Sequence, residues 1–298
     1  MPGPVARPAA LRTPRLPEWK AGGRVEGTTR VPQDEPCSLP SMPETVEERD
    51  RREREAYADE AMTQANEAWQ TRFAHIVKGP TTQRGWDTAF DVLAAKLGPD
   101  SRALDVGCGP GWSTAKVKEL GASYVLGYDI SEHYIAKAEQ EYGVPGQLEF
   151  RVHSAHRPVE GTFDVVCGFA VLHHLDFRAF LEDAYDRSLK PGGTMLFWEP
   201  MSHPVILAFH KFVRSAHSAD EWPLMPKDVR WMRDTFGHVT VRPVNLVAMF
   251  TNAASSFLFS EPDNPLSRLG DRIDHCLERR PRFAPFGQMG IIVIEKPR

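Results

Sequence analysis

The strongest constraint on the fold is a regular alternation of short apolar runs with longer amphipathic segments in the middle of the chain. The apolar runs have the length of strands, and the amphipathic segments have the spacing of helices. Strands joined through helices form right-handed crossovers, which build a mainly parallel α/β sheet with helices on both faces. The expected strands are 102–106, 124–128, 148–152, 163–169 and 194–198. Three helices are expected between them: one that begins at Trp112, one that begins at Ser131, and one near 177–189.

The N-terminal part divides into two segments. Residues 1–43 are rich in proline and arginine and poor in large apolar residues, so a disordered tail is expected. Residues 44–78 follow one helical pattern, in which a charged run precedes an apolar stripe that includes Trp69 and Phe73. This helix either packs against the core or forms a lid over a ligand cleft.

The main domain is expected to span 79–298. It begins where Gly79-Pro80 ends the first helix, and Thr81 or Thr82 is expected to cap the next one. The chain of 298 residues is long enough for one α/β domain of about 250 residues with extensions. Near the C-terminus two more strands are expected at 239–247 and 290–295, with a helix around 266–278 between them.

Charge, hydropathy and cysteine spacing exclude several classes of protein. A formal net charge of −4 argues against a nucleic-acid partner, because such surfaces carry a basic excess. No apolar run approaches the roughly 20 residues of a membrane span, so none is expected. The four cysteines lack the CxxC spacing of a metal site, so no metal is expected either. They indicate a reducing, cytoplasmic location, with Cys108 and Cys167 buried.

The turn after the strand at 102–106 carries the most informative motif, Asp105-Val106-Gly107-Cys108-Gly109-Pro110-Gly111. Its glycines let the backbone turn tightly and approach a ligand, and the N–H groups of the following helix can bind an anion. A dinucleotide loop would place its third glycine at Trp112, whereas here it is Gly111. The acid before the loop would repel a pyrophosphate but can pair with an ammonium group.

This loop resembles motif I of the class I S-adenosylmethionine-dependent methyltransferases, in their type 11 or UbiE-like small-molecule group. Asp129 lies 18 residues after Gly111 and is similar to the acid that holds the ribose hydroxyls in this family. The resemblance continues through 163–166, 171–175 and 189–193, in the order of the family. It implies a Rossmann-like methyltransferase fold with seven strands, the last antiparallel, and a helical lid and cap.

The resemblance also assigns a site for S-adenosylmethionine, which becomes S-adenosylhomocysteine. Asp129 would hold the ribose, and Ile130 would lie against the adenine. Where the family often has an acid for the adenine amino group, this chain has Val152-His153-Ser154-Ala155-His156, and either Ser154 or the backbone at Ala155 is expected to take its place. The residues assigned to the cofactor are Asp105, Gly107, Cys108, Gly109, Gly111, Asp129, Ile130, Ser154, Ala155 and Phe169.

Two residues are candidates for catalysis. His173 follows the fourth strand, where donor and acceptor meet in this fold, and its imidazole can remove a proton near neutral pH. The alternative is that the His173-His174 pair is a structural signature. Glu199 ends the fifth strand and is expected to point into the cleft as a proton acceptor, or else to form a structural ion pair.

The acceptor pocket is expected to lie beneath a cap insertion at about 201–236, whose aromatic and aliphatic residues suit an apolar molecule. Trp69, Phe73, His174, His203 and His210 are assigned to the acceptor. Glu199-Pro200 followed by a helical cap is loosely similar to terpenoid-modifying methyltransferases of secondary metabolism.

The sequence therefore predicts transfer of a methyl group to oxygen or carbon of an apolar or aromatic small molecule, by in-line displacement. Such a reaction mainly requires alignment and exclusion of water. Two alternatives remain open: a non-catalytic scaffold that binds S-adenosylmethionine, and a methyltransferase that acts on a protein. The acceptor itself and formation of a homo-oligomer are not determined by the sequence.

Overall fold

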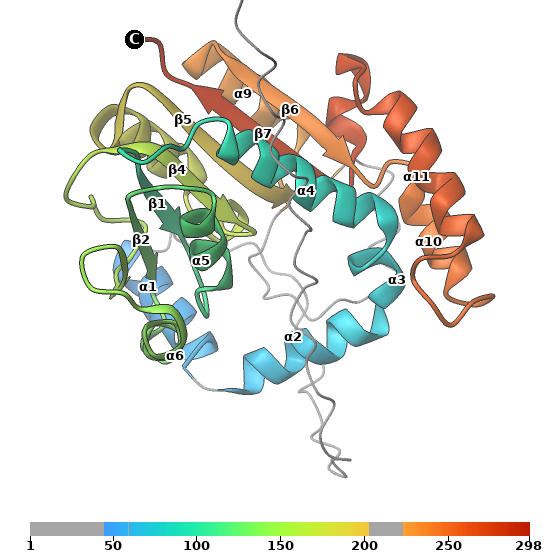
Figure 1. The fold of residues 1–298 in the computed structure, drawn as a ribbon, viewed down its shortest axis with the longest axis horizontal. Helices are drawn as coiled ribbons and strands as arrows, with labels where there is room; N and C mark the ends of the chain where they lie inside the picture. The colour runs from blue at the N-terminus through green and yellow to red at the C-terminus, as the bar shows by residue number, and fades with distance from the viewer. Residues whose placement is uncertain (1–44, 59, 203–222) are drawn as a thin grey trace, which may run out of the picture. The chain divides into compact units, whose positions relative to one another are not determined.

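A seven-stranded sheet forms the centre of the computed structural model, which describes residues 45–58, 60–202 and 223–298 (Figure 1). The strands are β1 (Arg102–Val106), β2 (Tyr124–Asp129), β3 (Leu148–Val152), β4 (Phe163–Phe169), β5 (Leu189–Pro200), β6 (Val239–Val244) and β7 (Met289–Glu295). Their order across the sheet is β3-β2-β1-β4-β5-β7-β6. All neighbours are parallel except β7, which pairs antiparallel with β5 and β6. The predicted fold class is confirmed.

Helices pack on both faces of this sheet. They are α1 (Val46–Ala56), α2 (Glu60–Arg72), α3 (Ala74–Val77), α4 (Pro80–Ala94), α5 (Trp112–Glu119), α6 (Glu132–Tyr142), α7 (Phe177–Asp183), α9 (Pro226–Phe236), α10 (Ala248–Ser255) and α11 (Pro265–Leu277). Shorter helical turns are η1 (Leu172–His174), η2 (Ala184–Ser188) and η3 (Pro281–Phe286).

Alternating strand residues divide the core into two layers. Along β5, Met195 and Phe197 belong to the layer that includes α7 and α9, whereas Leu196 and Trp198 belong to the layer that includes α4, α5 and α6. This alternation is the period of two that a sheet covered on both faces requires. All four side chains are buried, so β5 lies in the centre of the molecule.

The predicted strands are present, and the differences concern their ends. β5 begins at Leu189, five residues earlier than expected, because the preceding helix ends in the turn η2 and the chain joins the sheet directly. β6 ends at Val244, and the chain then enters α10, which the sequence pattern did not reveal. α9 was not predicted either.

The segment 44–78 was expected as one helix and is three. α1 ends at Ala56, and the carbonyl oxygen of its C-cap Tyr57 accepts a hydrogen bond from the Ser131 hydroxyl at 2.7 Å. α2 ends at Arg72, and the short α3 begins at Ala74. The next helix also starts differently, since Gly79 is the N-cap and Pro80 the first helical residue, while the hydroxyls of Thr81 and Thr82 are not caps.

α10 and α11 form a closely packed antiparallel pair on the side of α4. A Cβ added to Gly270 would lie 3.0 Å from the Ala248 Cα and would also collide with the Thr251 hydroxyl. The buried Asp274 carboxylate accepts hydrogen bonds from the backbone N–H groups of Leu246 and Val247 at 2.8 and 2.7 Å. Burial raises the pKa of Asp274 despite these bonds.

Three predictions fall on residues outside the described part of the chain. These are the disordered tail at 1–43, most of the cap insertion at 201–236, and the acceptor residues His203 and His210. Among the described residues, none of the helices has both the length and the apolar character that crossing a bilayer requires.

The contact at Gly270 leads to a stability prediction. We expect Gly270→Ala to lower the free energy of unfolding by roughly 1–3 kcal/mol, because the added methyl group overpacks the α10–α11 contact. Urea denaturation measures the change. Adding Thr251→Ala should restore part of the loss, since it removes one of the colliding groups. Gly98→Ala is the control, because its Cβ would only reach the Ser101 hydroxyl at 3.9 Å. Equal stability of Gly270→Ala and the wild type would contradict the prediction.

Candidate active site

The glycine loop between β1 and α5 adopts a conformation that few other residues tolerate. Gly107, Gly109 and Gly111 have φ angles of 63°, 51° and 89°. A Cβ on Gly107 would collide with the side chain of Val171, and a Cβ on Gly111 would lie 2.7 Å from the Ala138 Cβ. An added Cβ on Gly109 would meet no protein atom within 4 Å, so this glycine borders open space. The loop is therefore packed from behind and open in front at Gly109.

Asp105 lies behind this loop. Its carboxylate is completely buried and accepts hydrogen bonds from the hydroxyls of Ser113 and Thr114, both at 2.7 Å. Burial raises the pKa of Asp105 to about 6, and the two hydroxyl donors counteract this effect. The carboxylate thus holds the first turn of α5, and the expected pairing of Asp105 with a ligand ammonium group stays a prediction.

Asp129, at the end of β2, faces the open side of the loop. One carboxylate oxygen accepts a hydrogen bond from the Gly109 N–H at 2.9 Å, and the other accepts one from the Ser131 N–H at 2.9 Å. Burial raises the pKa of Asp129, although these backbone donors favour its charged form. A carboxylate has about four lone-pair directions, so Asp129 retains acceptor capacity for a ligand.

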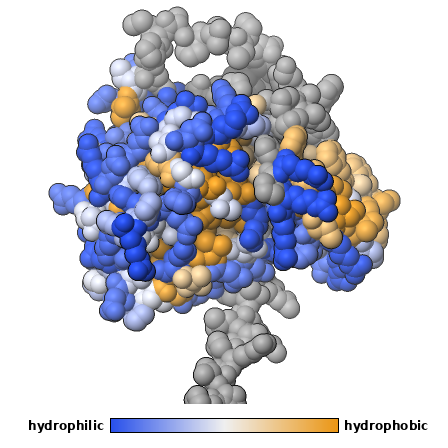
Figure 2. Space-filling view, turned by 90° about the horizontal axis from the view of Figure 1, so that it is seen from above, coloured by the Kyte–Doolittle hydropathy of each residue, from blue (hydrophilic) through white to orange (hydrophobic). Residues whose placement is uncertain are grey.

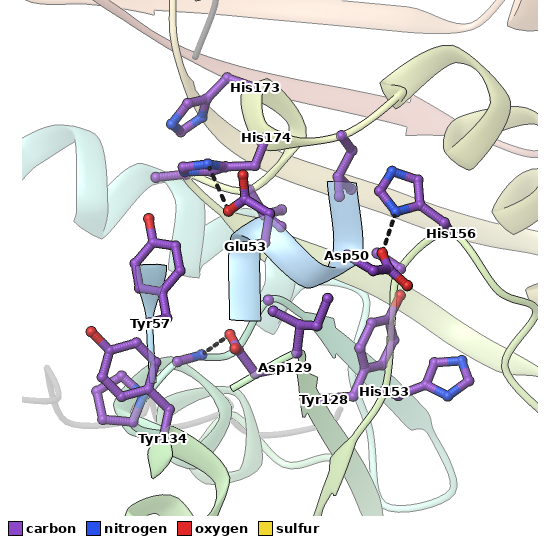
Figure 3. A pocket seen from close by; sticks show the side chains of 18 of the residues that line it. Asp50, Glu53, Tyr57, Tyr128, Asp129, Tyr134, His153, His156, His173 and His174 are labelled. Carbon is purple, nitrogen blue, oxygen red and sulfur yellow. Dashed lines mark hydrogen bonds and ion pairs between the residues drawn. The ribbon is translucent and has the colours of Figure 1, made fainter. Parts of the chain in front are cut away.

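The loop and Asp129 border a cavity of about 390 Å³ at the carboxyl ends of β1, β2 and β4 (Figure 3). This is where ligands bind in parallel α/β sheets, and the volume lies in the range of small-molecule sites. The described residues that line it are Asp50, Glu53, Tyr57, Trp69, Gln70, Gly107, Gly109, Pro110, Tyr128, Asp129, Ile130, Tyr134, His153, Ala155, His156, Ala170, Val171, His173, His174 and Leu175.

α1 forms one wall of this cavity and is held there by polar contacts. The Asp50 carboxylate is buried, and its Oδ1 accepts a hydrogen bond from the Ser154 hydroxyl at 2.8 Å and lies 2.9 Å from His156 Nδ1. One turn later, Glu53 lies 3.6 Å from His174 Nδ1. Figure 3 shows both carboxylates reaching from α1 towards these histidines. The helix is thus joined to the loops that follow β3 and β4.

His173 also lines the cavity and is oriented by Glu199. Glu199 is completely buried, and its Oε1 accepts hydrogen bonds from the backbone N–H groups of Val171 and Leu172 at 2.8 and 2.9 Å. Its Oε2 lies 2.9 Å from His173 Nδ1. Since a carboxylate only accepts, Nδ1 carries the proton and Nε2 has the lone pair. The arrangement fixes both the tautomer and the ring position of His173.

The structure brings together about half of the residues that the sequence assigned to the site. Those on the cavity wall are Gly107, Gly109, Asp129, Ile130 and Ala155 for the cofactor, and Trp69, His173 and His174 for the acceptor and catalysis. This placement does not test their roles, which remain proposals.

The other assigned residues lie behind the wall, each for a physical reason. Cys108 is buried and its N–H donates to the Tyr128 carbonyl, while Gly111 packs against α6. Ser154 uses its hydroxyl to hold Asp50. Phe169 packs against Trp86, Phe90 and Trp112, and Phe73 packs against Trp69. Glu199 does not point into the cleft, because two backbone N–H groups and His173 surround its carboxylate.

Sequence reasoning missed several cavity residues, chiefly those of α1. Asp50 and Glu53 belong to a charged run that resembles an ordinary solvated helix face. Asp50 and its partner Ser154 are 104 positions apart in the chain. A weak signal was available, since Asp50, Glu53 and Tyr57 follow each other at intervals of three and four and therefore share one helix face.

Comparison with known proteins agrees with this geometry. Residues 104–197 match a family model described as a methyltransferase domain. In these residues, about a third of its length, the chain resembles a class I methyltransferase domain. Domains of this class take their methyl group from S-adenosylmethionine.

Curated relatives match the same part of the chain. It is 37% identical over 100 residues to a ubiquinone biosynthesis O-methyltransferase of Methylococcus capsulatus. This alignment covers 32% of this chain and 42% of the relative. It is 33% identical over 109 residues to phosphoethanolamine N-methyltransferase 1 of Arabidopsis thaliana, covering 35% of this chain and 22% of the relative. The chain thus spans less than half the length of these relatives.

A solved structure supports the fold. The chain superposes with a TM-score of 0.53 and 18% identity on a chain from a complex that contains the Haloferax volcanii Trm112 methyltransferase activator. The match covers 78% of this chain and 97% of the other.

The buried Asp105 leads to a prediction on pH. In the folded protein the pKa of this carboxyl is about 6, whereas in the unfolded chain it is near 4. The folded state therefore binds the proton more tightly, and the free energy of unfolding contributed by Asp105 falls as the pH rises from about 4 to about 6. We expect Asp105→Asn to remove this fall, which amounts to at most about 3 kcal/mol. Denaturant unfolding of both proteins across this range measures the difference.

Thr114→Ala serves as the matched control. It keeps the carboxylate but removes a hydroxyl donor that lowers the pKa of Asp105, so the fall should persist and extend to higher pH. If the wild type and Asp105→Asn show parallel pH dependence, the carboxyl does not titrate in this window.

Proposed function

We propose that the chain transfers a methyl group from S-adenosylmethionine to an apolar or aromatic small molecule, with His173 as the base. The observation that carries the proposal is that one cavity is lined by the glycine loop and Asp129 and also by His173. A donor held at the loop and an acceptor held at the histidine would then share one space. Such proximity and orientation account for much of the catalysis of a displacement reaction.

The charge of the cavity suits this donor. Three carboxylates, Asp50, Glu53 and Asp129, line it, and no lysine or arginine is among its described lining residues. An acidic cavity attracts a cation such as a sulfonium and repels a pyrophosphate, which disfavours a dinucleotide. Asp129 can accept hydrogen bonds from ribose hydroxyls, and the open space in front of Gly109 leaves room for the ligand backbone.

Residues of this chain would supply three parts of the mechanism. When bound, S-adenosylmethionine provides an electrophilic methyl group. His173 would use Nε2 to remove a proton from an acceptor hydroxyl, because Glu199 fixes the proton on Nδ1. Glu199 does not touch the cavity, so it is a positioning residue. α1 and α2 would exclude water from the far side, which is the role of the lid expected from the sequence.

The cavity residues near His173 suit an acceptor that is an aromatic or apolar molecule carrying an oxygen atom. Tyr57, Trp69 and Tyr134 provide aromatic surfaces, and His173 and His174 lie beside each other with ring centroids 4.1 Å apart. A base next to aromatic surface suits a phenolic or enolic hydroxyl. The similarity to an O-methyltransferase points the same way, whereas the similarity to an N-methyltransferase shows that the shared segment does not fix the acceptor.

The role of Asp129 can be tested by calorimetry. We expect Asp129→Ala to weaken binding of S-adenosylmethionine by about 1–3 kcal/mol, the scale of lost hydrogen bonds to a charged group. Asp129→Asn, which keeps one acceptor oxygen, should lose less. An unchanged dissociation constant in both variants would remove Asp129 from the donor site.

Glu199→Gln tests the base and the residue that positions it. The amide oxygen can still accept from the Val171 and Leu172 N–H groups, but its NH₂ would donate to His173 Nδ1 and move the imidazole proton to Nε2. We expect turnover to fall by about 10²–10⁴, as in other systems where the base is held in the wrong tautomer. Affinity for S-adenosylmethionine should stay within twofold. Equal turnover would show that His173 is not the base.

Turnover is measured as tritiated methyl transferred from the donor to fractionated metabolites of a cell extract. Label in the small-molecule fraction supports the proposal, and His173→Gln should abolish it. Donor binding without label in any fraction would favour a non-catalytic scaffold, and label confined to protein would favour a protein acceptor.

A further inference from the structure

The outer faces of α10 and α11 carry an apolar patch that packs against no other described part of the chain. Phe257 and Leu258, in the turn between the helices, are 88% and 70% exposed. In Figure 2 the patch appears as the orange region on the right, the side on which Figure 1 shows α10 and α11. We define this outer patch as Phe250, Phe257, Leu258, Phe259, Leu269 and Ile273, all of which are exposed.

The side chains of the outer patch are exposed although α10 and α11, the helices that carry or flank them, are regular. The inner faces of α10 and α11 are already packed together at Gly270, so the outer side chains have no core to enter. Asn264 caps α11 by accepting hydrogen bonds from the N–H groups of Leu266 and Ser267, both at 3.0 Å. Its side-chain NH₂ donates to the Glu261 carbonyl at 2.8 Å. The turn therefore presents its aromatic and aliphatic side chains outward in a fixed arrangement.

The charges around the outer patch are predominantly positive once ion pairs are taken into account. Asp263 pairs with Arg268, Asp271 pairs with Arg84, and the Asp274 carboxylate is occupied by backbone N–H groups. By contrast, Arg272, Arg279 and Arg280 are exposed and form no ion pair within the described part of the chain, whereas Glu261 is the one exposed carboxylate of 257–280 in the same condition. Arg272 follows Leu269 by three residues on α11 and therefore lies next to it on the helix surface, so a cationic and an apolar group are neighbours there.

We propose that the outer patch and these arginines dock on the surface of an anionic lipid bilayer. Large exposed apolar patches mark sites of interaction, and apolar side chains with adjacent arginines match the interfacial region and the headgroups of such a membrane. A second copy of the chain fits less well. A symmetric dimer places the same patch against itself and would bring arginines of both copies together, whereas anionic headgroups neutralise them.

Co-sedimentation of the full chain with vesicles tests the proposal. We expect binding to phosphatidylcholine vesicles that contain phosphatidylglycerol, weaker binding to pure phosphatidylcholine, and a loss of binding as salt is added. The double variant Phe257→Asp and Leu258→Asp should weaken binding at least tenfold, because it places charges where acyl chains would lie. Arg272→Gln and Arg280→Gln should each weaken binding to the anionic vesicles by about fivefold.

Two controls keep the result interpretable. Val144→Asp also replaces an exposed apolar residue, 43% exposed in the turn between α6 and β3, and should bind vesicles as the wild type does. Leu258→Ser is a milder change for the case that the double variant does not fold, as judged by its thermal melting. Absence of wild-type binding to anionic vesicles, or equal binding by Leu258→Ser, would overturn the proposal. So would a wild-type dimer in sedimentation velocity that Leu258→Ser dissociates, since the patch would then be a protein interface.

Discussion

Buried carboxylates at the ends of parallel strands hold the candidate active site together. Asp105 near the end of β1 binds the first turn of α5, Asp129 at the end of β2 binds the Gly109 N–H, and Glu199 in β5 binds two N–H groups of the turn after β4. A loop that leaves a sheet has backbone donors without partners, and a buried unpaired donor costs about 1–3 kcal/mol. One carboxylate satisfies two or three donors at once, so short loops can remain ordered beside an open cavity.

The carboxylates differ in how much hydrogen-bond acceptor capacity they leave for a ligand in the cavity. Asp105 and Glu199 are enclosed by donors and act on the site only through the groups they hold. Asp129 keeps part of its capacity directed at the cavity. Conversely, Asp50 and Glu53 of α1 bring negative charge from the other side. The acidic residues of the cavity thus come from both the sheet and α1, and neither forms the cavity alone.

The sequence predicted the sheet well because each strand depends on residues that are adjacent in the chain. Alternating burial along β5 and the glycine loop are local patterns, and both were found. Asp105, Ser154 and Glu199 were assigned by their position in a motif, and the hydrogen-bond partners of Ser154 and Glu199 come from distant parts of the chain. Glu199 meets an N–H group 28 residues earlier, and Ser154 meets a carboxylate 104 residues away. Such pairings follow from the packing of α1 and η1, which no local pattern specifies.

The absence of a side chain at Gly107 links the two halves of the site. Val171 occupies the place where a Cβ would stand, and Val171 begins the turn that carries His173. The loop at the donor side and the turn at the histidine side are therefore in direct van der Waals contact. An alanine at 107 would require a smaller residue at 171 and would still be strained by its φ angle of 63°, so a change at 107 is disfavoured unless 171 changes with it. The distance between the glycine loop and the turn of His173 is in this way set by two residues together, Gly107 and Val171.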